Sequence, residues 1–165
     1  MKEKLHTVYL SLGSNMGNKE ENINRAIKNI NERMGRVTAI SAFYITKPVG
    51  FESENDFVNA ACEVQTILSP LEVLELTQVI EREIGRKRKS VNGNYTDRLI
   101  DIDILLYDNE VMEYPHLVIP HGHMHERDFV LRPLADIAGE VIHPVLLKSI
   151  EKLKNDLNHS SDSAS

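Results

Sequence analysis

Apolar residues recur along the first two thirds of the chain with two periods, which predict strands and helices in turn. Alternation at every second position marks strand-like runs at 7–12, 37–45, 56–65 and 101–107. Spacing of three and four residues marks helix-like runs at 19–34 and 70–85. The order strand–helix–strand–strand–helix–strand is typical of the ferredoxin-like α+β arrangement.

The ends of the two predicted helices carry recognisable signals. Ser69, Pro70 and Glu72 form a capping-box start, in which Ser69 and Glu72 each accept an amide of the first turn. Gly35 follows the first helical run and predicts its end.

The last third of the chain predicts smaller elements. Asp108 and Asn109 form a turn, followed by a short segment at 110–112, a strand at 117–119 and helices at 129–138 and 146–157. Residues 159–165 are polar and Ser-rich, so we expect a disordered tail. The chain is therefore expected to form one domain over 1–158.

Two carboxylates interrupt the last strand of the core pattern. Asp101 and Asp103 alternate with isoleucines, so both point to one face of the strand while Ile100, Ile102 and Ile104 point to a core. Adjacent carboxylates repel unless a cation lies between them, and Mg2+ is the usual choice where phosphates complete its shell. An acidic, solvent-facing strand is the alternative interpretation.

A basic loop precedes this strand. Gly85-Arg86-Lys87-Arg88-Lys89 opens a polar segment that ends in Arg98, beside the carboxylates. Cationic side chains bind phosphate oxygens, and an acidic pair binds the associated metal. A charge run alone is typical of a solvated loop, but its combination with Asp101 and Asp103 indicates a metal–polyphosphate site.

Net charge restricts the class of binding partner, and cysteine content indicates the cellular compartment. The net charge of −6 argues against a general nucleic-acid binder, and no apolar run is long enough to span a bilayer. Cys62 is the only cysteine, which fits a reducing cytoplasm, and its apolar surroundings predict a buried thiol.

Several ordered motifs between Thr7 and Pro144 resemble the 6-hydroxymethyl-7,8-dihydropterin pyrophosphokinase family of folate biosynthesis. The motifs are Gly13-Ser14-Asn15, Phe43-Tyr44-x-Thr46-x-Pro48-x-Gly50, Asp56-Phe57-x-Asn59-Ala60-Ala61, Gly85-Arg86-x-Arg88, Arg98-x-Ile100-Asp101-Ile102-Asp103-Ile104, Ile119-Pro120-His121 and Arg127-x-Phe129-Val130-Leu131-x-Pro133-Leu134. Their order and spacing carry the resemblance.

The resemblance implies a ferredoxin-like βαββαβ core elaborated with a C-terminal hairpin and helices. It also implies transfer of pyrophosphate from ATP to the hydroxymethyl group of a dihydropterin, with AMP released. Two Mg2+ ions bound with ATP would be held by Asp101 and Asp103. The expected partners are the two substrates, with no nucleic acid or membrane, and the protein is expected to be a cytoplasmic monomer or weak homo-oligomer.

The same resemblance assigns the remaining site residues. Pterin binding is expected from Thr46, Lys47, Val49, Phe57, Asn59 and Phe129. Nucleotide binding is expected from Gln78, Glu81, Arg86, Arg88, Arg98, Ile104, His121 and Arg127, of which Arg86, Arg88 and Arg98 are also expected to act in catalysis. From the pattern alone, Phe57 and Phe129 are typical core residues, whereas Asn59 is a polar residue in an apolar strand, where a buried amide needs partners.

The chain departs from the family pattern in the loop before Arg98, which lacks the usual Trp and contains Tyr95 instead. Two rival classes stay open. His121, His123 and His125 have the composition of a zinc site, which would make the protein a zinc-dependent hydrolase. The second rival class is a non-catalytic ferredoxin-like module that binds RNA or protein. Such a module would be expected to carry a basic, aromatic sheet face, which this acidic chain does not show.

Overall fold

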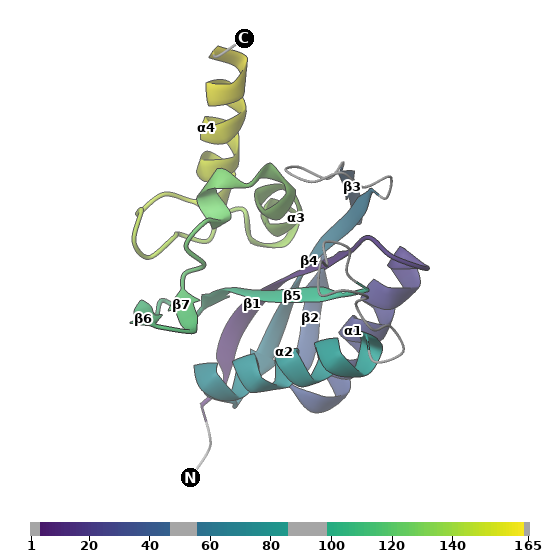
Figure 1. Cartoon of the computed structure of the whole chain (residues 1–165). Helices are drawn as coiled ribbons and strands as arrows, with labels where there is room; N and C mark the ends of the chain where they lie inside the picture. Colours follow the sequence, from purple (N-terminus) through teal and green to yellow (C-terminus); the bar gives the residue numbers. More distant parts are fainter. Residues whose placement is uncertain (1–3, 47–55, 86–98, 164–165) are drawn as a thin grey trace.

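The computed structural model describes residues 4–46, 56–85 and 99–163, and its centre is an antiparallel sheet (Figure 1). The sheet has the strand order β2–β4–β1–β5, with a short β3 also paired to β4. The strands are β1 (His6–Ser14), β2 (Arg36–Ile40), β3 (Tyr44–Thr46), β4 (Phe57–Thr66) and β5 (Asp101–Tyr107). β1, α1 (Lys19–Arg33) and β2 form a split βαβ unit, because β4 lies between β1 and β2. The predicted ferredoxin-like class is confirmed.

Helices cover both faces of this sheet. On one face lie α1 (Lys19–Arg33) and α2 (Pro70–Gly85), and on the other lies α3 (Asp128–Ala138), against which α4 (Ile150–Ser163) packs (Figure 1). A hairpin of β6 (Met112–Tyr114) and β7 (Leu117–Ile119) adjoins β5, and a 3-10 turn η1 (Met124–Glu126) leads into α3.

The two-residue period of the strands builds two separate cores. Along β1, Val8, Leu10 and Leu12 face α1 and α2, whereas Tyr9 faces α3. The same alternation in β5 buries Ile102 and Ile104 on the α1–α2 side and leaves the two aspartates on the other side. The sheet face beneath α3 therefore continues into a polar region.

The predicted capping box at the start of α2 is confirmed. The amide of Ser69 donates to Glu72 Oε1 at 2.9 Å, and the amide of Glu72 donates to Ser69 Oγ at 3.2 Å. These bonds satisfy amides that the first helical turn leaves free, and the Ser69 donors lower the pKa of Glu72.

The predicted strand at 37–45 is wrong in one respect, because the chain forms two strands there. Between β2 and β3, the Ser41 hydroxyl accepts the amide of Ala61 at 2.8 Å, while the Ser41 amide donates to the Ala61 carbonyl at 2.9 Å. A side-chain oxygen thus replaces the backbone carbonyl that a continuous strand would present, and the ladder is interrupted.

The last helix begins at Ile150 rather than near residue 146. The preceding residues form a loop in which His143 Nδ1 accepts the amides of Val145 and Leu146 at 3.2 and 3.0 Å, and Leu147 has a φ of 60°. The backbone of 159–163 continues α4 where a disordered tail was expected, while the division into a domain over 1–158 and a tail stays a prediction.

No helix in the described part of the chain is long and apolar enough to cross a membrane.

Replacement of Gly35 by Ala is expected to destabilise the fold strongly. A Cβ at Gly35 would overlap the carbonyl oxygen of Gln65 in β4, so backbone would have to move. We expect urea denaturation to show a loss of about 3 kcal/mol. Gly122→Ala is the control because a Cβ there meets nothing within 4 Å, and equal stability of the two variants would contradict the close approach.

The stability of the loop at 143–147 is expected to fall at acid pH. Burial, helped by the nearby His125, lowers the pKa of His143, so the unfolded chain binds this proton more readily than the folded protein. The stabilisation is complete above about pH 6.5 and is lost as the pH falls further. His143→Asn keeps an acceptor but does not titrate, so urea midpoints at pH 7.5 and 5.5 should differ less than in the wild type, and equal differences would refute this role.

Candidate active site

A cavity of about 610 Å3 opens on the α3 side of the sheet, next to the N-terminal end of α3. Its walls come from β1, β3, β4, β5 and the segment entering α3. The lining residues are Ser11, Gly13, Thr46, Phe57, Asn59, Asp101, Asp103, Glu126, Arg127, Asp128 and Phe129. This volume lies within the range of small-molecule sites.

Asp101 and Asp103 both line this cavity, in agreement with the alternation expected for their strand. The register of the sheet places Ser11 of β1 directly beside Asp103, and Gly13 beside Asp101. Small residues on β1 therefore leave the carboxylates accessible from the cavity.

A third carboxyl group approaches the pair from α2. Glu81 Oε2 accepts the backbone amide of Ile102, the residue between the two aspartates, at 2.8 Å. The pKa of Glu81 is raised to about 7, chiefly by burial. The Ile102 amide lowers this pKa, whereas the charges of Asp101 and Asp103 and a hydrogen bond with Asp101 contribute to raising it. The local excess of negative charge is the electrostatic situation that a bound cation would relieve.

The same cavity also contains amide and aromatic groups. Asn59 is 4% exposed, and its Nδ2 donates to Thr46 Oγ1 at 2.8 Å. Phe57 and Phe129 also line the cavity, and Phe129 is 37% exposed. The guanidinium carbon of Arg127 lies 5.9 Å from the centre of the Phe129 ring, within reach of a cation–π contact. A flat, polar ring would find both stacking surfaces and hydrogen-bonding groups here.

A second cavity of about 380 Å3 lies on the other side of Asp103, between β5 and the β6–β7 hairpin. Ile102, Ile104 and His121 are among its lining residues, and Asp103 lines both cavities. The His121 amide donates to the Leu105 carbonyl at 3.0 Å, which ties this segment to β5. Burial, followed by the charge of Arg127, lowers the pKa of His121 and favours a neutral ring.

Two residues expected to bind nucleotide do not line either cavity. Gln78 is exposed on α2, and Glu81 turns towards the backbone of β5. Lys47, Val49, Arg86, Arg88 and Arg98, together with Tyr95 of the Trp-less loop, lie outside the described residues.

The histidines that suggested zinc belong to no group of three metal-binding side chains in the described part of the chain. The ring centres of His121 and His123 are 6.4 Å apart, and His123 Nδ1 lies 3.3 Å from Glu126 Oε2. Within residues 4–46, 56–85 and 99–163, no three His, Cys, Asp or Glu side chains are grouped so as to hold a metal ion. A site with two carboxylates therefore needs oxygen atoms from a ligand to complete a metal shell.

Sequence reasoning missed several lining residues of the main cavity. Ser11 and Gly13 lie on the cavity face of β1, and their alternation with Leu10 and Leu12 is the signal that would have found them. Glu126 and Asp128 were missed because only the tertiary position of α3 brings them to the cavity.

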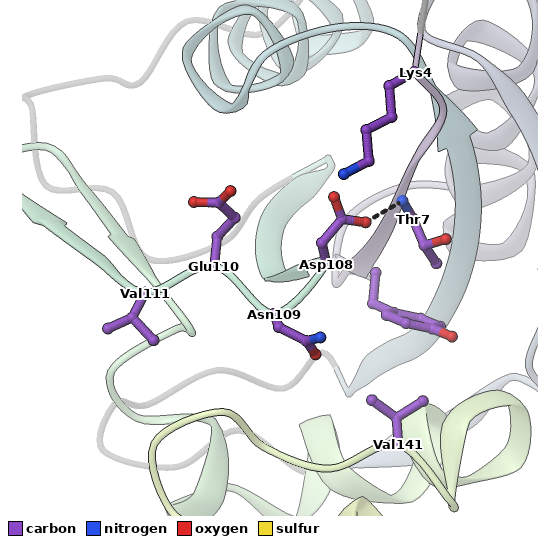
Figure 2. Close-up of a pocket in the computed structure, with 8 residues that line it drawn as sticks. Lys4, Thr7, Asp108, Asn109, Glu110, Val111 and Val141 are labelled. Atoms are coloured by element: carbon purple, nitrogen blue, oxygen red, sulfur yellow. Dashed lines mark hydrogen bonds between the residues drawn. The ribbon is translucent and has the colours of Figure 1, made fainter.

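A further hollow near the N-terminal end of β1 is separate from these cavities (Figure 2). Figure 2 shows Lys4, Thr7 and Val141 around a turn formed by Asp108 and Asn109. The Asp108 carboxylate accepts the Thr7 amide at 2.8 Å and contacts His6 Nδ1 at 2.6 Å, so it stabilises the end of the sheet.

Two cavities that share the Asp103 carboxylate are typical of an enzyme that brings two ligands together. Comparison with known proteins agrees with this class. Residues 9–139 match the family model described as 7,8-dihydro-6-hydroxymethylpterin-pyrophosphokinase. The chain is 46% identical over 138 residues to a 2-amino-4-hydroxy-6-hydroxymethyldihydropteridine pyrophosphokinase of Porphyromonas gingivalis, covering 83% of this chain and 93% of that protein.

The same enzyme of Bacillus subtilis is 44% identical over 134 residues, covering 81% of this chain and 78% of that protein. Among solved structures, Plasmodium falciparum HPPK-DHPS with pterin and p-hydroxybenzoate superposes with a TM-score of 0.77 at 18% identity. The superposition covers 99% of this chain and 45% of that one. At this identity the similarity supports the fold and nothing further.

The chain belongs to the 7,8-dihydro-6-hydroxymethylpterin-pyrophosphokinase family. It is an enzyme of folate biosynthesis that transfers pyrophosphate from ATP to 6-hydroxymethyl-7,8-dihydropterin.

Proposed function

We propose that the pterin occupies the cavity of Asn59 and Phe129, that ATP occupies the cavity of Ile104 and His121, and that Mg2+ is held between them by Asp101 and Asp103. The observation that carries this proposal is that Asp103 lines both cavities. A metal at this carboxylate would contact ligands in either cavity, which is what a transfer between two substrates requires.

The pterin site is supported by its chemistry. The Asn59 amide lies in a buried position where its remaining hydrogen-bonding groups can match a heterocycle edge, and Thr46 Oγ1 fixes its orientation. Phe57 and Phe129 supply aromatic surface for stacking. The expected contributions of Lys47 and Val49 stay predictions.

The nucleotide and phosphate site is supported by Ile104, His121 and Arg127. Ile104 and His121 lie together in the cavity beside the hairpin, and Arg127 lies in the pterin cavity at the start of α3. A guanidinium there would stabilise charge on phosphate oxygens during transfer. Arg86, Arg88 and Arg98 are expected to bind phosphates as well, and the nucleotide role of Gln78 stays a prediction.

The donor set fits Mg2+, because two carboxylates supply hard oxygen ligands and substrate phosphates supply the rest. We propose two ions, bound with ATP; when bound they neutralise charge on the polyphosphate and orient it. In the reaction, the hydroxymethyl oxygen bonds to the β-phosphorus as the bond to AMP breaks, and the hydroxyl proton is released. The chain's own residues hold the two substrates in line, so positioning is the main source of rate.

We also propose that the protein acts in the cytoplasm as a monomer or weak homo-oligomer. One chain supplies both cavities and the carboxylates between them, so the proposed chemistry needs no second copy. The reduced, buried thiol of Cys62 fits a reducing compartment.

The decisive experiment measures AMP formation from ATP and Mg2+, with and without 6-hydroxymethyl-7,8-dihydropterin. Asp101→Asn keeps the side-chain size but removes a metal-binding charge, so we expect pterin-dependent AMP formation to fall at least roughly 1,000-fold with an unchanged far-UV spectrum. Glu113→Gln, an exposed change on β6, is the control. A nearly normal rate for Asp101→Asn would remove this residue from the metal site.

Gly13→Ala is expected to weaken pterin binding selectively. A Cβ at Gly13 would lie 3.3 Å from Asn59 Oδ1, which forces the amide to shift inside the cavity. We expect the KM for pterin to rise about 10-fold, which corresponds to the loss of roughly one hydrogen bond. The KM for ATP is expected to change little. Steady-state kinetics with each substrate varied would test this, and an equal rise in both values would argue against the pterin position.

A further inference from the structure

The residue between the two aspartates is held by a side chain from another element. β5 is the last strand on its side of the sheet in the described part of the chain, and it pairs with β1 alone. Every second amide of such a strand points away from the sheet and needs another partner. For Ile102 that partner is Glu81 of α2, whose Oε2 accepts the amide at 2.8 Å.

This hydrogen bond constrains the aspartates through the peptide plane. The Asp101–Ile102 peptide unit is planar, so a fixed direction of its N–H also fixes the Asp101 carbonyl and the rotation between the two residues. Ile102 is 5% exposed and is anchored in the core on the opposite face. A strand held at both its amide and its apolar side chain has little freedom to twist Asp101 or Asp103 away from the cavity.

Glu81 also differs from a substrate-binding residue by its position. It lines neither cavity in the part of the chain that the structure describes. It is only partly exposed, and its carboxyl group is directed to the β5 backbone and to Asp101. The nucleotide contact expected of Glu81 from the family resemblance stays a prediction.

We propose that Glu81 is a positioning residue for the metal site, which holds the Asp101–Ile102 peptide so that both aspartates face the shared metal. The inference rests on the proposed binding of Mg2+ at Asp101 and Asp103. For this role, the side chain at position 81 must carry a carbonyl-type oxygen that reaches the Ile102 amide from α2.

Two substitutions separate the effect of side-chain length at position 81 from the effect of its charge. Glu81→Gln keeps the side-chain length and an oxygen that accepts the Ile102 amide. Glu81→Asp keeps the acidic group but is one methylene shorter, so it cannot reach that amide from the same backbone. Glu75→Asp makes the same shortening at an exposed position of α2 and is the matched control.

The first measurement is hydrogen exchange of the Ile102 amide by NMR, made without metal or substrate. We expect its exchange, relative to the amides of β1, to be at least about 10-fold faster in Glu81→Asp and within about 3-fold of wild type in Glu81→Gln. Normalising to β1 separates a local change from a general loss of stability. Equal protection in wild type and Glu81→Asp would overturn the proposal.

The second measurement is Mn2+ binding by electron paramagnetic resonance in the presence of α,β-methylene-ATP, in which the bond to be broken is replaced. We expect Glu81→Asp to bind Mn2+ at least about 10-fold more weakly, and Glu81→Gln and Glu75→Asp within about 3-fold of wild type. Equal weakening in Glu81→Gln and Glu81→Asp would show that charge matters, not reach, and would refute the positioning role. Absence of Mn2+ binding in the wild type would instead refute the metal site itself, whatever the exchange result.

Discussion

The pairing of β5 with β1 is the constraint on which both cavities depend. In this register Ser11 lies beside Asp103, while Leu12 lies beside Ile102 and both apolar side chains enter the core under α2. A slip of one residue would place the aspartates in that core and the isoleucines in the cavity. Because burial of an unpaired carboxylate is far more costly than exposure of an isoleucine, this register is strongly specified.

An irregularity in the same pairing separates the end of β5 that carries the two aspartates from the end that packs into the cores. The register shifts between Tyr9 and Leu10, which leaves Leu105 as an additional residue in β5. Leu105 and Leu106 consequently both join the core under α3, and Tyr107 returns to the opposite core. The bulge thus changes which side chains face α3 without disturbing the alternation at Asp101 and Asp103.

The position of α3 decides which part of the sheet face stays accessible. Val130, Leu131 and Leu134 bury the region above Tyr9 and Leu105. Phe129, one residue before this apolar stripe, is left at the cavity. Asp136, further along the helix, accepts the Tyr44 hydroxyl at 2.7 Å and so joins β3 to α3. The cavity is therefore the uncovered continuation of the same sheet face, closed at one side by β3.

Local patterns determined most of the elements of this protein. Alternation and the capping box predicted β1, α2 and β5 within a residue or two, because these signals involve neighbours in sequence. The order of strands and helices also determined the fold class, and the Asp-x-Asp alternation determined that both carboxylates share a face. Only the tertiary structure decided three other features. The strand breaks at Ser41 because this residue has a hydrogen-bond partner in β4. The late start of α4 follows from the buried His143, and the inward turn of Glu81 depends on the position of β5. Each of these depends on a hydrogen bond or burial that the folded chain creates, and in the cases of Ser41 and Glu81 the partner is some twenty residues away.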